Sequence, residues 1–250
     1  MGAWCLMKVV VTGGGTSAPI DDVRVITNVS TGRTAAAITE HCLARGAEVW
    51  HVHAPSAQLP FARSARFDLD VDDPRAEFDR LTQLREAWRS VRDRLHLRPL
   101  PTGTVAEYAE TLRRVLTEEA IDVAFLPMAV SDYEPIPQTG KISSRLDALS
   151  IPSRRAPKVI RAVRDWAPSV YLVGFKLQSG VAPEELIRLA HDACLANRAD
   201  LTVANDLQDV KAGRHALYLV RPYQPTVTLP PGPDLAARLV NQVWEWVGKS

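Results

Sequence analysis

Cysteine is scarce in this chain, which contains only Cys5, Cys42 and Cys194 among 250 residues. An odd number of widely spaced cysteines fits neither a disulfide framework nor a zinc site. The scarcity therefore predicts a cytoplasmic protein that folds without crosslinks. Cys42 and Cys194 lie in segments with a helical pattern, where we expect buried thiols with no chemical role.

The sequence also lacks a long apolar run. No stretch approaches the roughly 20 apolar residues of a membrane-spanning helix, and the N-terminal segment does not have the pattern of a signal peptide. We therefore expect a soluble protein that is not exported and has no membrane partner. No sign of charge dominates, because 30 basic residues stand against 29 acidic ones and the formal net charge is +1. Such a chain has no global field for nucleic acid, so any anion site must be local.

The chain is rich, by contrast, in alternating short apolar runs and helical patterns. Hydrophobic residues make up 46% of it, which is enough for a sizeable core. Strands are expected at 9–11, 48–53, 121–127, 170–175 and 201–204, helices at 33–45, 72–95, 105–119, 157–166, 183–197 and 233–247, and a hairpin at 215–220 and 225–229. This order predicts an α/β fold in one domain, 1–250: a Rossmann-like, mainly parallel sheet with helices on both faces and a small C-terminal β-hairpin.

The first predicted strand ends in a glycine-rich segment that runs from Gly13 to Ser17. Closely spaced glycines let backbone amides approach a phosphate, and the two hydroxyls of this segment add donors. Gly13, Gly15 and Ala18 also fit the loose dinucleotide-binding pattern G-x-G-x-x-[GA], which raises an NAD(P)-dependent reductase as an alternative. Pro19 opposes that alternative, because the helix of such proteins begins inside the glycine loop. A purely structural turn also stays open.

A second polar segment contains Arg24 and Asn28 on a predicted loop before the helix at 33–45. Fixed donors at such a place can grip a carboxylate or a phosphate, while Ser30 or Thr31 can cap the helix. Taken alone, the segment fits helix capping and a solvated surface equally well.

From Val11 to Gly32 the chain resembles the phosphopantothenate-cysteine ligases of monofunctional type, which make 4′-phosphopantothenoylcysteine in coenzyme A biosynthesis. The resemblance covers nearly the whole chain, because further motifs follow in the family's order. They are Ala129-Val-Ser-Asp-Tyr133, Gly140-Lys-Ile-Ser-Ser144, Ala156-Pro-Lys158, Gly174-Phe-Lys-Leu177 and Val203-Ala-Asn-Asp206. One such match could arise by chance, but the ordered set could not.

The resemblance implies a reaction in two steps. The carboxylate of 4′-phosphopantothenate attacks the α-phosphate of a nucleoside triphosphate and pyrophosphate leaves; the amine of L-cysteine then displaces the nucleotide from the acyl-nucleotide intermediate. Lys141 is implied to neutralise the negative charge that develops. Asn28 and Arg24 are implied as further catalytic residues and as the residues that hold phosphopantothenate and the intermediate.

The nucleotide is implied to bind at the ends of several strands and at one helix N-terminus. Asp132 would face the nucleotide or its Mg²⁺, and Pro157 with Lys158 would begin a helix whose free amides suit a triphosphate. No residue is assigned as a direct metal ligand. The implied nucleotide-binding set is Gly13, Gly14, Gly15, Thr16, Ala129, Asp132, Lys141, Pro157, Lys158, Val159, Ile160 and Phe175.

Two departures from the family pattern leave the nucleotide undecided. Ala193 and Asn197 stand where many bifunctional bacterial members have nucleotide-contacting lysines, and the sequence 175–177 matches monofunctional members. CTP is expected to be preferred to ATP, because bacterial members generally use CTP. Residues 33–35 also differ from the family's usual basic residue, Met and Gly, which should alter helix packing rather than chemistry.

The resemblance further implies a homodimer, with the segments around Lys141 and at 205–230 as candidate interfaces. It implies a stand-alone ligase without the flavin-dependent decarboxylase domain of fused enzymes. The alternatives are the reductase, which also lacks its usual Tyr-x-x-x-Lys base, and a non-catalytic nucleotide-binding module.

Overall fold

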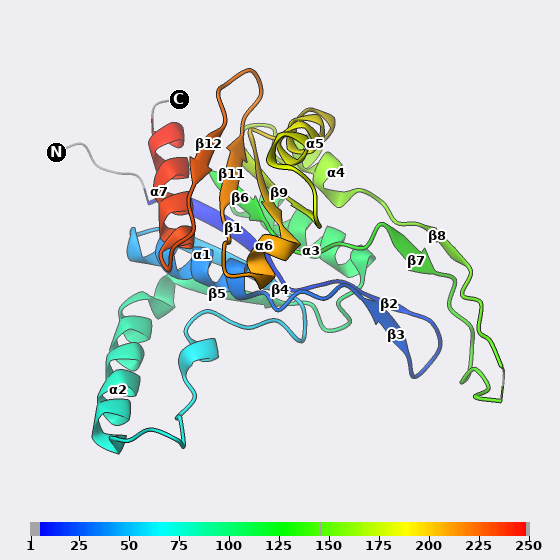
Figure 1. The fold of residues 1–250 in the computed structure, drawn as a ribbon, viewed down its shortest axis with the longest axis horizontal. Coiled ribbons are helices and arrows are strands. Elements are labelled where there is room, and N and C mark those ends of the chain that lie inside the picture. Colours follow the sequence, from blue (N-terminus) through cyan, green and yellow to red (C-terminus); the bar gives the residue numbers. More distant parts are fainter. Residues whose placement is uncertain (1–5, 146, 249–250) are drawn as a thin grey trace.

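The core of the protein is one eight-stranded sheet (Figure 1). The computed structural model describes residues 6–145 and 147–248. The strands lie in the order β12(Val227–Leu229), β11(Leu217–Val220), β10(Leu201–Asp206), β9(Tyr171–Gln178), β6(Val123–Leu126), β1(Lys8–Gly13), β4(Glu48–His53) and β5(Leu95–Pro99). The pairs from β10 to β5 are parallel, whereas β10–β11 and β11–β12 are antiparallel. The predicted fold class and C-terminal hairpin are therefore confirmed.

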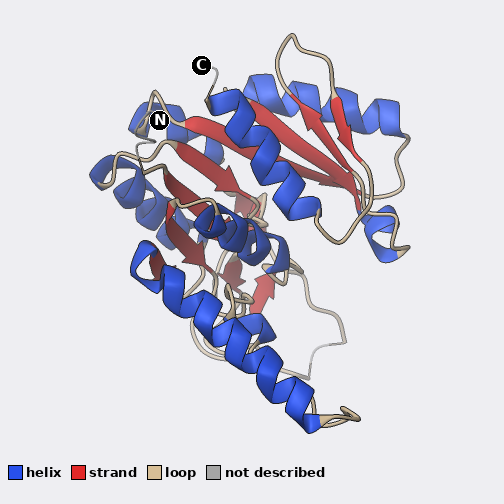
Figure 2. Ribbon diagram, turned by 90° about the vertical axis from the view of Figure 1, so that its left-hand side faces the viewer, coloured by secondary structure: helices blue, strands red, loops and turns tan. Residues whose placement is uncertain are grey.

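Helices cover both faces of this sheet (Figure 2). They are α1(Arg33–Ala44), α3(Val105–Glu118), α4(Val159–Trp166), α5(Pro183–Ala196), α6(Leu207–Lys211) and α7(Leu235–Val247). Alternate side chains of β1 show the division, because successive residues of a strand point to opposite faces. Val9 and Val11 pack in one cluster with residues of α1 and α7, while Val10 packs in another with residues of α3 and α4.

Two small antiparallel ribbons project beyond the carboxyl ends of the sheet strands (Figure 1). One pairs β2(Ser17–Pro19) with β3(Val25–Thr27), and the other pairs β7(Tyr133–Pro135) with β8(Ser153–Arg155). The sequence did not predict either ribbon, because three-residue strands with exposed side chains have too short a pattern to recognise. Backbone hydrogen bonds also join the two segments, as in Gln138 N to Ile20 O at 2.9 Å.

The predicted helix at 72–95 is wrong at its C-terminal end. The α-helix α2(Pro74–Val91) stops earlier, a turn of 3-10 helix follows at 92–94, and Leu95 begins strand β5. The apolar residues whose spacing predicted one long helix do not form a buried face. Phe78 is 61% exposed, and Val91 is the only apolar residue of α2 that is buried. Pairing with the edge of β4 determines the conformation of Leu95 instead.

The described cysteines lie where the sequence suggested. Cys42 on α1 and Cys194 on α5 are fully buried, and burial raises the pKa of both thiols. Cys5 lies outside the described residues. None of the helices in the described ranges is both long and apolar enough to cross a lipid bilayer.

Candidate active site

A cleft of about 610 Å³ opens at the carboxyl ends of the parallel strands. Ligands of open α/β sheets bind at this edge, where loops from several strands converge. The lining consists of residues 28–35, 126–132, 157–161 and 175–177, with Gly14, Tyr108, Ala193, Ala196, Asn197, Asn205, His215 and Leu217. The lining therefore brings together most of the motifs that the sequence pointed to.

The glycine-rich segment closes one end of the cleft but does not lead into a helix. Gly14 lines the cleft with φ +92°, and its carbonyl accepts the amide of Ala129 at 2.9 Å. Gly13, Gly15 and Thr16 do not line it, and the buried Thr16 hydroxyl accepts the Ser131 amide at 3.0 Å. The chain then forms the β2–β3 ribbon before α1 begins at Arg33. This ribbon separates the glycines from the helix, unlike the dinucleotide-binding arrangement.

Two helix N-termini open into the cleft. The first turns of α1 and α4 both belong to the lining. Neither N-cap residue, Gly32 or Lys158, makes a capping hydrogen bond through a side chain, and neither helix has an acidic residue in its first turn. The Thr31 hydroxyl accepts the Arg33 amide at 3.4 Å, and the amides that follow in the first turn of α1 are not bound by a side chain. Free amides and the positive end of the helix dipole make such a terminus a site for an anion. Two of them facing one cleft suit a polyphosphate.

Helix α4 begins slightly later than the sequence predicted. Pro157 precedes it, Lys158 is its N-cap residue and Val159 is its first helical residue, whereas the prediction began the helix at Pro157. All these residues nevertheless line the cleft together with Ile160 and Phe175. Phe175 lies within β9, which continues to Gln178, and not at the end of a strand as predicted. The amides at the start of α4 thus face the space where the nucleotide was expected.

Asn28 follows β3 directly and lines the cleft. Its side-chain Nδ2 donates to the carbonyl of Ala129 at 3.2 Å, so the residue is tied to the loop that follows β6. The Ala129 carbonyl also accepts a hydrogen bond from the Thr16 amide at 3.0 Å. This carbonyl therefore connects the segment after β1, the β2–β3 ribbon and the loop that follows β6. The remaining Asn28 side-chain oxygen is available for a ligand.

Asp132 and Lys158 form an ion pair at the mouth of the cleft. Their side chains are 63% and 53% exposed, so water screens the pair and its contribution to stability is small. A bound triphosphate would compete for Lys158. Asp132 is the only carboxylate in the lining, and the described residues contain no cluster of metal-ligating side chains. This composition fits Mg²⁺ carried by phosphate oxygens with help from one carboxylate.

Several polar residues of the cleft were not predicted as site residues. Arg33, Arg161 and Lys176 add positive charge to the lining, and His215 contacts Asn205, with Nδ2 and Nε2 separated by 3.4 Å. Burial lowers the pKa of His215, so its ring is neutral at pH 7. Lys176 stands beside Phe175 in a motif already noted, which was the available signal. The others depend on contacts between distant segments and left no local pattern.

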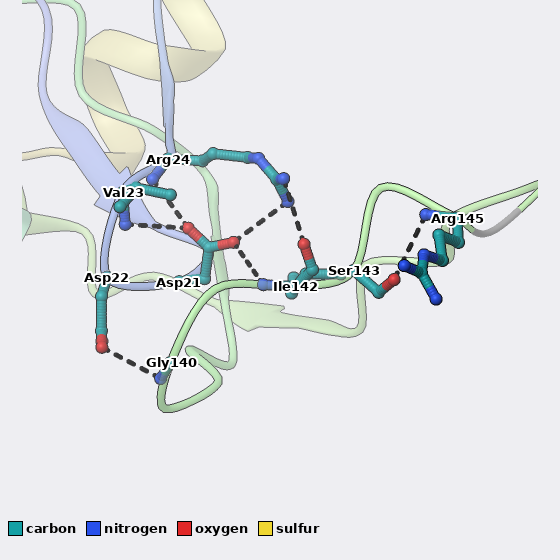
Figure 3. A network of polar contacts seen from close by, with 8 residues as sticks. All are labelled: Asp21, Asp22, Val23, Arg24, Gly140, Ile142, Ser143 and Arg145. Carbon is teal, nitrogen blue, oxygen red and sulfur yellow. Dashed lines mark hydrogen bonds and ion pairs between the residues drawn. The ribbon is translucent and has the colours of Figure 1, made fainter.

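Arg24 and Lys141 are not brought into the cleft of this chain. The Arg24 guanidinium donates to Asp21 Oδ2 at 3.0 Å and to the carbonyl of Ile142 at 3.1 Å (Figure 3). Its observed partners are therefore groups of the protein itself. Lys141 lies on the exposed loop between β7 and β8, next to this contact.

A protein-family model matches residues 5–70 and 98–245, and its description is DNA/pantothenate metabolism flavoprotein C-terminal domain. The chain belongs to this family. The unmatched segment 71–97 contains α2 and the beginning of β5. All residues that line the cleft lie within the matched ranges, whereas helix α2 lies in the unmatched segment.

Curated relatives extend the comparison. Phosphopantothenate--cysteine ligase 2 of Oryza sativa is 30% identical over 81% of this chain and 69% of its own length. The coenzyme A biosynthesis bifunctional protein CoaBC of Thermococcus kodakarensis is 28% identical over 94% of this chain, which spans only 50% of that relative. The human phosphopantothenate--cysteine ligase is 29% identical over 83% of this chain and 75% of its own length.

Solved structures share the fold of this family member. The DNA/pantothenate metabolism flavoprotein from Streptococcus pneumoniae is similar with a TM-score of 0.75 and 26% identity, covering 97% of this chain and 99% of that one. A Cab2 variant in complex with phosphopantothenate-cysteine reaches a TM-score of 0.81 at 22% identity, covering 97% and 87%. The overall fold is thus one that occurs in solved structures.

Proposed function

We propose that this protein is a ligase that joins 4′-phosphopantothenate to L-cysteine at the expense of a nucleoside triphosphate. The observation that carries the proposal is the pair of helix N-termini, those of α1 and α4, in one cleft with Lys158, Arg161 and Lys176. Such a cleft suits a triphosphate. The names of the rice and human relatives give the two substrates that are joined. A ligase of this kind needs a nucleoside triphosphate as co-substrate, which is the ligand that the cleft suits.

The proposed chemistry proceeds through an acyl-nucleotide. A carboxylate oxygen of phosphopantothenate attacks the α-phosphorus, and the bond to pyrophosphate breaks. The cysteine amine then attacks the acyl carbon, loses a proton and releases the nucleoside monophosphate. Asn28 holds the acyl phosphate near the cleft, and Lys141 neutralises phosphoryl oxygens. Because Lys141 lies outside the cleft and both of its neighbours are hydrogen-bonded to the β2–β3 turn, this role requires its exposed side chain to reach the cleft of a second copy.

The metal and the nucleotide are part of the same proposal. Mg²⁺ would be held by the triphosphate and by Asp132, and it would withdraw charge from the phosphoryl group under attack. CTP is proposed as the preferred nucleotide over ATP. The lining has Ala193 and Asn197 on α5 instead of basic side chains, which leaves Lys158, Arg161 and Lys176 as its cations on the α4 and β9 side.

We also propose that the chain acts as a homodimer through its two ribbons. Apolar side chains stand exposed on them: Val25 is 56% exposed, Ile26 41%, Tyr133 56% and Ile136 53%. Grouped exposed apolar residues of this kind suit a protein interface. Sedimentation of the pure protein checks this, and a monomer at micromolar concentration would contradict it.

The reaction is tested by pyrophosphate release from 4′-phosphopantothenate, cysteine and Mg²⁺ with either CTP or ATP. Release that depends on all substrates is expected, and the faster nucleotide identifies the preferred one. Lys141→Gln should bind the nucleotide with little change yet turn over about 100-fold more slowly, since it removes a charge used in the transition state. No release with either nucleotide would reject the ligase and leave a non-catalytic binding module. A saturable fluorescence response to NAD(P)H would revive the reductase.

A further inference from the structure

The backbone on both sides of Lys141 is fastened to the turn between β2 and β3 (Figure 3). On one side, Asp22 Oδ2 accepts the Gly140 amide at 3.0 Å. On the other side, Asp21 Oδ2 accepts the Ile142 amide at 3.0 Å. A residue held at both neighbours has a fixed backbone, whereas its own side chain stays exposed and free to contact a ligand.

Asp21 is the centre of this contact. Its side chain is completely buried, and Oδ1 accepts the amides of Val23 at 2.9 Å and Arg24 at 2.8 Å. Oδ2 accepts the guanidinium of Arg24 at 3.0 Å as well as the Ile142 amide. A buried carboxylate with four donors is fully satisfied and geometrically fixed.

Arg24 closes the same contact into a ring. One of its terminal nitrogens binds Asp21 and the other donates to the Ile142 carbonyl, so both polar backbone groups of Ile142 are bound by the turn. The network thus joins a fully buried carboxylate, that of Asp21, to the partly exposed guanidinium of Arg24.

The ribbon that carries this turn also carries Asn28. Strand β3 runs from the turn to Asn28, and the Thr27 hydroxyl donates to the Thr16 carbonyl at 3.0 Å. The Lys141 loop is therefore fastened to the element that supplies a residue of the cleft. Movement of the ribbon would carry both with it.

We propose that Asp21 is a positioning residue, which acts on the reaction only through the loop that it holds and thereby fixes Lys141 relative to Asn28. The inference rests on the proposed ligase function for its kinetic consequence, but the contact itself can be tested without activity. Asp22 contributes a weaker second attachment, because its side chain is exposed.

The physical test is cleavage after Lys141 by an endoproteinase specific for lysine. Asp21→Asn replaces one carboxylate oxygen by an amide nitrogen, which cannot accept a hydrogen bond from Ile142 or Arg24. The loop should therefore open, and cleavage should accelerate about tenfold or more. Arg24→Ala removes the donor to the Ile142 carbonyl and leaves Asp21 and the Lys141–Ile142 bond intact, and it should also accelerate cleavage. Asp22→Asn retains an acceptor for Gly140 and serves as the matched control. Equal cleavage in Asp21→Asn, Arg24→Ala and the natural protein would overturn the proposal.

The kinetic test asks whether Asp21 works through Lys141. Asp21→Asn should lower kcat about 10- to 100-fold with little change in KM for the triphosphate, since misplacement by about 1 Å costs rates of this size. In a Lys141→Ala background the same change should cause no further loss. A full additional loss in that background would overturn the positioning role. If the natural protein shows no ligase activity at all, the proposed function fails while the cleavage result still decides the contact.

Discussion

Gly15 lies so close to Asn28 that a methyl group on its Cα would stand 2.3 Å from the Asn28 carbonyl oxygen. No real Cβ contact is this short, so the backbone of one segment would have to shift. The third glycine of the cluster is thus explained by the approach of the β2–β3 ribbon and not by contact with a ligand, since Gly15 is absent from the cleft lining.

Gly15→Ala should therefore displace Asn28 and destabilise the protein by about 1–3 kcal/mol, the usual cost of overpacking. Urea unfolding measures the loss. Gly248→Ala is the control, because its new methyl group would meet Trp244 O at 3.3 Å at the exposed end of α7. Equal stability of the two variants would show that the ribbon moves freely.

A lysine at position 197 should strengthen triphosphate binding. Asn197 lines the cleft on α5, where a cation would add attraction of up to about 1 kcal/mol, or about fivefold in KM. Initial rates of Asn197→Lys measured against the triphosphate concentration check this, and the gain should shrink at high salt. Asn197→Gln controls for side-chain length. An unchanged KM would place the triphosphate elsewhere in the cleft.

Most of the sheet could be predicted from the sequence because its strands, apart from β5, are short apolar runs between turn and helix signals. The boundary near Leu95 could not, since helical spacing continues into a segment whose conformation is determined by pairing with β4. Local pattern cannot report an edge that forms only on folding.

The sequence likewise predicted the position of some residues of the site and not of others. Asn28 and Asp132 follow strands, Lys158 precedes a helix and Phe175 lies in the carboxyl half of β9, so topology alone brings them to one edge. Arg24 is different: its partner Ile142 lies 118 residues away, and only the folded chain shows that its guanidinium is already engaged. Its predicted role in substrate binding stays untested.

Arg164 should be important for stability although it lies outside the cleft. Its side chain is 16% exposed and binds Asp200 Oδ2 at 2.5 Å. It also donates to three carbonyls, those of Pro168, Val170 and Arg198. Arg164→Ala leaves these acceptors without a partner and should cost about 1–3 kcal/mol in the free energy of unfolding.

Arg113→Ala is the control for Arg164→Ala, because Arg113 pairs with Glu110 on the exposed face of α3. Its effect should be clearly smaller. Comparable urea midpoints for the two variants would contradict the assignment of Arg164 as a buried tie.

The stability of helix α2 should depend on pH through Glu77, an acidic residue in its first turn. The hydrogen bond from Arg80 and the amide of Asp68 lower the Glu77 pKa from 4.5 to about 2, against the effect of burial. A depressed carboxyl pKa gives stability that is fully present above pH 4.5 and is lost as the pH falls toward 2. Glu77→Gln should thus speed hydrogen exchange in α2 at pH 7, and its difference from the natural protein should shrink below pH 4.5. A difference that does not vary with pH would reject the charge interaction.

The helix α2 stands apart from the sheet and supplies no residue to the cleft (Figures 1 and 2). The family model does not match residues 71–97, the segment that contains α2. It is accordingly the natural place to graft foreign sequence: a reporter domain inserted near Asp70 would be carried at a distance from the chemistry.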